Sequence, residues 1–143
     1  MCTTWGIAGH QIYLLHVFRK KVTFPELKRA VRAQDDLYHP TEILIEDKAS
    51  GIQLIQELQN EGMPNVRKCT PLGNKLMRLI AQTPTVESGL VFLPKSVPWL
   101  EAFLYEITIF PNGRYDDQVD SFSQALEWIK IKRGGAGQGS STG

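Results

Sequence analysis

The chain has 143 residues, of which 42% are hydrophobic, and its 16 basic and 15 acidic residues leave a net charge of +1. This length suits one domain with a real core, and the small charge means that any surface that binds nucleic acid must be local. No apolar run approaches the roughly 18 residues that a membrane helix needs, and no signal peptide opens the chain, so we expect a soluble intracellular protein. Cys2 and Cys69 belong to no metal-binding spacing and indicate a reduced, cytosolic chain.

The first predicted elements are a β-hairpin and a capped helix. Residues 3–7 and 11–19 are rich in β-branched and aromatic residues and flank an Ala-Gly-His turn. A helix follows at Thr23, where Thr-Phe-Pro-Glu has the form of a capping box with proline in the first turn. We expect this helix to end near His39 and Pro40.

Strands and helices alternate through the rest of the chain. Short apolar runs predict strands at residues 42–45, 66–69 and 90–93. Apolar residues at helical spacing predict helices that begin near Ser50 (in a second capping box), Asn74, Pro98 and Asp116. This order predicts the α/β fold class, with helices packed on a mixed sheet. Residues 133–143 are rich in glycine and serine, so we expect a flexible tail after a folded domain of residues 1–132.

Two acidic clusters stand at positions where α/β proteins bind ligands. Glu46 and Asp47 directly follow an apolar strand, and the carboxyl ends of strands collect reactive groups. Asp116, Asp117 and Asp120 open the final helix, where Asp117 and Asp120 can share one face. Carboxylates from separate elements are the ligands that Mg²⁺ prefers, and a pair of such ions can stabilise both ends of a phosphodiester displacement. The alternative is that the aspartates only cap the helix and that Glu46 and Asp47 form a solvated turn.

Local basic clusters are the only sign of a surface that could bind nucleic acid. Lys75 and Arg78 are three residues apart on one predicted helix. A second group surrounds the first helix and comprises Lys20, Lys21, Lys28, Arg29 and Arg32. These side chains could follow a phosphate backbone or form an ordinary solvated helix face. The phosphate-binding loop of ATPases is not present in the sequence.

Several short stretches carry a resemblance when they are taken together. They are Thr3–Gly6, Phe24–Ala30, Leu44–Gly51, Phe92–Pro94, Pro98–Leu100, Phe110–Gly113 and Asp116–Ser121. In this order they resemble the C-terminal nuclease domain of phage terminase large subunits, which has an RNase H-like fold. The resemblance covers nearly everything from Cys2 to Ile129.

The resemblance implies a Mg²⁺- or Mn²⁺-dependent endonuclease of the two-metal type that cuts concatemeric double-stranded DNA. Glu46 matches the second acid of the family, and Asp116 with Asp117 matches the third. Asp47 and Asp120 are further candidate metal ligands. The implied partners are double-stranded DNA, a terminase ATPase domain, the small terminase subunit and the portal, and the implied location is the cytoplasm of a bacterial host of a phage or prophage. We expect Lys75 and Arg78 to contact the DNA.

The sequence departs from the family pattern at its first acid. In the family this acid is an aspartate on a central strand, which precedes the hairpin and lies between it and the strand that ends at Glu46. The matching hairpin begins here at Cys2, so we expect an RNase H-like sheet without that strand and with two unpaired edges. The open explanations are a gene start further upstream, a prophage remnant, or a strand supplied by another chain. The rival functions are an inactive remnant that still binds DNA or a packaging partner, and an unrelated α/β protein that binds a small molecule.

Overall fold

The structure of the protein is a computed structural model that describes residues 2–139, with side chains described as far as Arg133. Strands and helices alternate as expected, and the mixed α/β class is confirmed. The chain divides into two compact units. Unit 1 comprises the chain up to Arg19 and again from Gly73 onward, and unit 2 comprises Lys20–Leu72.

Unit 1 is built on the predicted hairpin. β1 (Cys2–Ala8) pairs antiparallel with β2 (Gln11–Phe18), with a bulge between Thr4 and Trp5. The short β5 (Val91–Phe92) pairs parallel with the other side of β2, so the strand order is β1-β2-β5. β1 therefore stands at an edge of this sheet.

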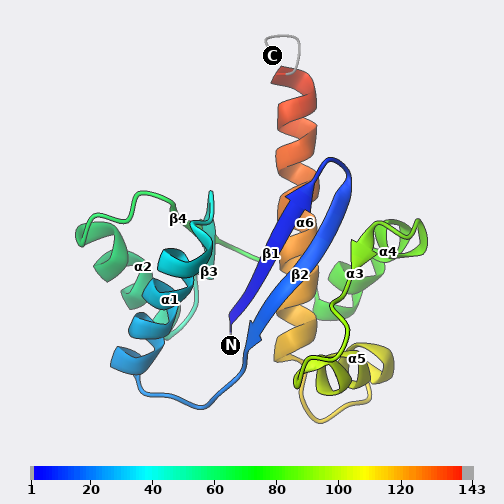
Figure 1. The fold of residues 1–143 in the computed structure, drawn as a ribbon, viewed down its shortest axis with the longest axis horizontal. Helices are drawn as coiled ribbons and strands as arrows, with labels where there is room; N and C mark the ends of the chain where they lie inside the picture. The colour runs from blue at the N-terminus through cyan, green and yellow to red at the C-terminus, as the bar shows by residue number, and fades with distance from the viewer. Residues whose placement is uncertain (1, 140–143) are drawn as a thin grey trace. The chain divides into compact units, whose positions relative to one another are not determined.

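Four helices complete the described part of unit 1: α3 (Lys75–Ile80), α4 (Thr83–Glu87), α5 (Leu100–Ile109) and α6 (Asp117–Gly139). The long α6 runs beside the hairpin (Figure 1). Residues of β2 and α5 and one face of α6 meet in one core, which contains Ile12, Leu14, Val17, Phe103, Phe122, Leu126 and Ile129. Because this apolar face of α6 is buried against the sheet, the polar side chains in its first turn are held on a defined side of the helix.

Unit 2 packs two helices on a parallel strand pair. α1 (Phe24–Tyr38) and α2 (Ser50–Asn60) accompany β3 (Ile43–Glu46) and β4 (Val66–Cys69), which pair from Ile43↔Val66 to Glu46↔Cys69. The core of this unit is Val31, Leu54, Ile55, Leu58, Met63 and Val66. Ile43 and Ile45 pack against that core, so Glu46, the next residue after Ile45, projects from the opposite face of the strand pair.

The two capping boxes predicted in unit 2 had different outcomes. The first is confirmed, because the Thr23 side chain accepts the Glu26 amide and the Glu26 side chain accepts the Thr23 amide. The second prediction is wrong: α2 begins at Ser50, its N-cap is Ala49, and no side chain caps it. Ala49 has a φ of 51°, so the tight loop after β3, rather than a hydroxyl cap, determines where α2 begins.

The C-terminal segment differs from the expected tail. α6 continues to Gly139, well past Lys132, because each further residue of an established helix adds one backbone hydrogen bond. The rest of the expected tail, residues 140–143, lies outside the described residues. Among the described helices, none has the length and apolar character needed to cross a membrane. Within the described part of the chain, Cys2 and Cys69 form no disulfide.

Candidate functional site

The start of α6 carries the acidic residues that the sequence singled out. Asp116 immediately precedes the helix, and its carbonyl accepts the amide of Asp120 at 3.0 Å. Asp116 and Asp120 are therefore one turn apart and share a face, whereas Asp117 is rotated by about 100° from Asp116. We call Asp116, Asp117 and Asp120 the α6 acidic cluster.

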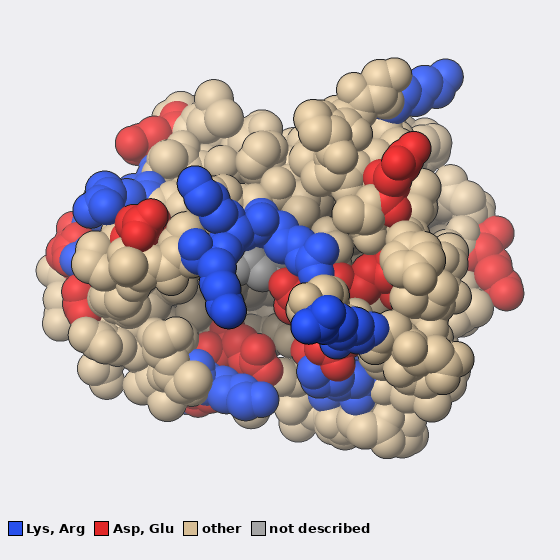
Figure 2. All heavy atoms as spheres, turned by 90° about the horizontal axis from the view of Figure 1, so that it is seen from below, with Lys and Arg blue, Asp and Glu red and all other residues tan. Residues whose placement is uncertain are grey.

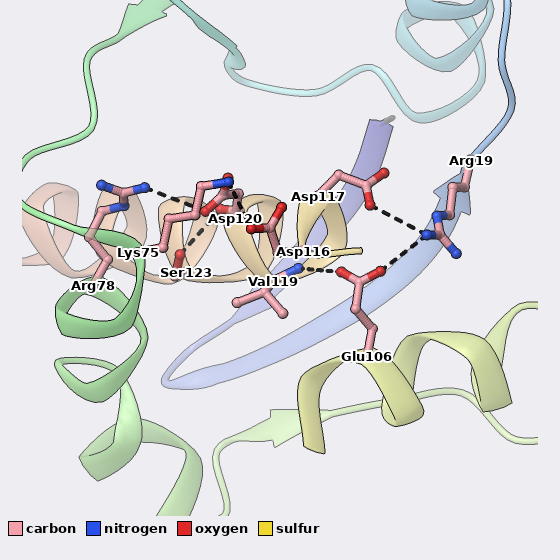
Figure 3. A network of polar contacts seen from close by, with 9 residues as sticks. All are labelled: Arg19, Lys75, Arg78, Glu106, Asp116, Asp117, Val119, Asp120 and Ser123. Atoms are coloured by element: carbon pink, nitrogen blue, oxygen red, sulfur yellow. Dashed lines mark hydrogen bonds and ion pairs between the residues drawn. The ribbon is translucent and has the colours of Figure 1, made fainter. Parts of the chain in front are cut away.

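Two carboxylates of the α6 acidic cluster, those of Asp116 and Asp120, bind the same lysine ammonium group. The Lys75 Nζ lies 2.9 Å from Asp116 Oδ2 and 3.1 Å from Asp120 Oδ2. Arg78, which lies on α3 like Lys75, also contacts Asp120, with Arg78 Nη2 3.4 Å from Asp120 Oδ1 (Figure 3). The hydrogen bond to Asp116, followed by the contacts to Asp120, raises the pKa of Lys75 above its ordinary value. The ammonium group thus marks a position that both oxygens can reach together.

Asp117 points away from Lys75 and toward the end of β2 (Figure 3). Its Oδ1 lies 3.4 Å from the Nη2 of Arg19, which is 3.2 Å from Glu106 Oε1. The Arg19 guanidinium also lies over the ring of Tyr115, 5.2 Å from its centroid. Arg19 therefore links the half-exposed carboxylate of Asp117 to a carboxylate in the interior.

Glu106 on α5 is a site residue that the sequence analysis missed. It is only 4% exposed, and its Oε2 accepts the backbone amide of Val119, the third residue of α6, at 2.9 Å. Its Oε1 accepts the Nε2 of the buried Gln118 at 3.0 Å. The available signal was its position three residues after Phe103, on the face of α5 that packs into the core.

Glu46 stands at the end of β3 in unit 2, followed by a tightly packed loop. The Asp47 amide donates to Cys69 O and the Lys48 amide donates to Glu46 O, each at 2.9 Å. A Cβ on Gly51 would lie 2.1 Å from the Glu46 carbonyl oxygen, so only glycine fits where α2 starts against this carbonyl. Asp47 makes a long contact of 3.9 Å with Lys68.

The donor set fits a hard divalent cation in part. Carboxylate oxygens are the ligands that Mg²⁺ prefers, and Asp116 and Asp120 already share one cation. In the part of the chain that the structure describes, no group of three His, Cys, Asp or Glu side chains that could hold a metal ion is found. Glu46 belongs to unit 2 and the α6 acidic cluster to unit 1, and the metal-binding role that the resemblance implies for these acids stays a prediction.

The basic residues expected to bind DNA are engaged with carboxylates. Lys75 and Arg78 contact the α6 acidic cluster, and Arg78 also donates to Gly73 O at 2.7 Å. In unit 2, Lys28 pairs with Glu57 at 3.1 Å and with Glu61, and Arg32 pairs with Glu61. Figure 2 accordingly shows basic and acidic side chains close to one another, with neither sign covering the face drawn.

Comparison with known proteins identifies the family. The family model described as the terminase RNaseH-like domain matches residues 2–128. No curated protein and no solved structure matches the chain. The match includes both units, the strand that ends at Glu46 and the start of α6. The chain therefore belongs to the family of terminase RNase H-like domains.

Proposed function

We propose that this chain is the metal-dependent endonuclease module of a terminase that packages phage DNA. The observation that carries the proposal is that Asp116 and Asp120, at the start of α6, both bind the Lys75 ammonium group, at 2.9 and 3.1 Å. The chain belongs to the family of terminase RNase H-like domains, which supports a metal ion as the alternative cation at this position. The acids that would hold the metal are Glu46, Asp116 and Asp117, with Asp47 and Asp120 as additional ligands. A bound Mg²⁺ or Mn²⁺ supplies activation of water and charge neutralisation at the scissile phosphate.

The proposed substrate is double-stranded DNA, in its concatemeric form. Asp116 and Asp117 are 44% and 46% exposed, so a phosphate backbone can approach them from solvent. If a divalent cation bound the carboxylates in place of Lys75 and Arg78, these two side chains would supply positive charge for the DNA phosphates. Contacts to phosphate carry no sequence information, so little base preference is expected. The ATPase domain, the small subunit and the portal of a packaging motor are the proposed partners.

A metal-binding and cleavage assay on the full chain tests the proposal. We expect Mn²⁺ to bind in calorimetry and to support slow nicking of supercoiled plasmid that stops when the ion is chelated. Asp116→Asn and Glu46→Gln should each reduce both signals, because each removes a charged ligand. Glu101→Gln, at an exposed position of α5, removes the same charge away from the site and should change neither. DNA binding without Mn²⁺ affinity, or nicking that survives both ligand variants, would reject the nuclease assignment.

A further inference from the structure

The first turn of α6 is capped by a side chain from another helix. An N-cap side chain usually accepts the amide of the second or third helical residue. In α6 the third residue is Val119, and its amide donates to Glu106 Oε2 at 2.9 Å. Asp116 occupies the position before the helix, and its Oδ2 is bonded to Lys75. Glu106 therefore accepts the amide that an N-cap aspartate would usually accept. Oδ2 of Asp116 is bonded instead to the Lys75 ammonium group.

The same carboxylate also holds Arg19. One nitrogen, Arg19 Nη2, lies 3.2 Å from Glu106 Oε1 and 3.4 Å from Asp117 Oδ1. The Glu106 side chain is 5% exposed and that of Asp117 is 46% exposed. The interaction with the buried carboxylate is less screened by water, so Glu106 is the stronger anchor of the two.

We propose that Glu106 is a positioning residue for the α6 acidic cluster, because its buried carboxylate caps α6 and shares the Arg19 guanidinium with Asp117, so that Asp117 does not hold Arg19 alone. The effect of Glu106 on metal affinity rests on the proposed function, whereas its contacts with Val119 and Arg19 do not. Glu106 itself does not touch the metal or the DNA in this proposal. If its charge is removed, Arg19 retains Asp117 as its acidic partner and competes there with a divalent cation.

The anchoring is tested without metal, by NMR on the full chain. In Asp117→Asn, the Arg19 guanidinium should keep slow rotation and protection from exchange, because Glu106 still holds it. In Glu106→Ala the Val119 amide should exchange faster, whereas in Asp116→Ala it should stay protected. Loss of the Arg19 signal in Asp117→Asn, or exposure of Val119 in Asp116→Ala, would overturn the proposal. Both of these decisive variants leave Glu106 in place, so the test stands even if changes at Glu106 unfold the chain.

The consequence for the site is tested with Mn²⁺ and a double-variant cycle. Glu106→Gln should weaken Mn²⁺ binding by about ten-fold, the lower range for residues that orient metal ligands. In the Arg19→Gln background the same change should have no further effect, since the competing guanidinium is gone. An equal loss in both backgrounds would show that Glu106 acts only through general structure and would overturn the positioning role. Absence of Mn²⁺ binding by the unmodified chain would instead reject the proposed function, while the NMR test would still decide whether Glu106 anchors Arg19.

Discussion

Lys75 and Arg78 contact the α6 acidic cluster in the structure and are the residues that we propose to contact DNA. The structure has them on Asp116 and Asp120, with Lys75 Nζ 2.9 Å from the former. A divalent cation bound to these aspartates would compete with both side chains and release them for phosphate. Their proposed role in DNA binding should therefore depend on metal.

Replacing both residues by alanine should weaken binding to duplex DNA. With a divalent cation present, the slope of log affinity against log salt should fall by up to about two phosphate contacts, each worth about 0.9 in slope. Salt titrations of DNA affinity measure this. The matched control is Lys130→Ala with Lys132→Ala, which removes two exposed lysines near the other end of α6. An unchanged slope in the Lys75 and Arg78 variant would assign both residues to neutralising the α6 acidic cluster.

Among the elements, the turn from β3 into α2 determines where Glu46 lies. A methyl group on Gly51 would meet the Glu46 carbonyl oxygen at 2.1 Å, a backbone atom that cannot move aside on its own. The loop is already constrained by Ala49, whose φ is 51°. Packing in this turn and the placement of Glu46 are therefore coupled.

Gly51→Ala should destabilise the protein, although alanine usually favours a helix by about 0.5–1 kcal/mol over glycine. Overpacking against the Glu46 backbone should cost about 1–3 kcal/mol, and the displaced Glu46 should reduce Mn²⁺ affinity. Thermal unfolding and calorimetry measure the two effects. Ser50→Ala, at an exposed neighbouring position, is the control and should leave Mn²⁺ affinity unchanged. A higher melting temperature for Gly51→Ala would contradict the close approach.

Lys28 and Arg32 of α1 pair with Glu61, the residue that follows α2, and we call these ion pairs the clamp. Hydrogen bonds from Lys28 and then Arg32 hold the pKa of Glu61 below its ordinary value, and Glu61 in turn raises the pKa of Lys28. A carboxyl whose pKa is lowered by folding stabilises the protein above its unfolded pKa of about 4.3. That contribution is lost as the pH falls from there through the lowered pKa, while the Lys28 contribution is lost only above about pH 10.4.

Glu61→Gln should therefore reduce stability near neutral pH, and by progressively less as the pH falls below about 4.3. Urea unfolding of both proteins at about pH 6 and about pH 3 measures this difference. Glu87→Gln, an exposed carboxyl of α4 in the other unit, should show no such pH-dependent difference. A stability difference that is the same at both pH values would show that the clamp does not depend on the charge of Glu61.

At the scale of the whole molecule, the strands within residues 2–139 form two sheets, with β1 and β3 each at a sheet edge. An added strand that carries an aspartate could pair with the edge of β1. Such a strand would add ladder hydrogen bonds worth about 0.5–1.5 kcal/mol each and would supply a further carboxylate. Adding such a strand should therefore raise both the stability of the protein and its proposed metal-dependent cleavage of DNA.

Extending the chain at its N-terminus with an apolar strand that carries one Asp should raise the melting temperature and strengthen Mn²⁺-dependent plasmid cleavage. Alanine at the added Asp should keep the gain in melting temperature and remove the gain in cleavage. Thermal unfolding and nicking rates of the three proteins provide the measurement. Rapid cleavage by the unextended chain, lost in Glu46→Ala, would show that the added strand is not needed.

The sequence by itself determined the local elements and the positions of the acids. The hairpin, the Thr23 capping box and the apolar face of α6 depend on residues a few positions apart, so periodicity and cap chemistry predicted them. The sequence placed Glu46 at the end of a strand and the α6 acidic cluster at the start of a helix, because local sequence patterns indicate where strands end and helices begin. The second capping box failed at Ser50, because the start of α2 depends on a close backbone approach to Glu46 that no local pattern reveals.

Only the tertiary structure decided which side chains those acids contact. Lys75 meets Asp116 across 41 positions of the chain, and Arg19 meets Asp117 across 98. In the sequence Glu106 is an ordinary polar residue of a largely apolar helix, and only folding brings its carboxylate to the Val119 amide. These contacts follow from how α3, α5 and β2 pack around α6, and the separation along the chain leaves no local pattern from which to predict them.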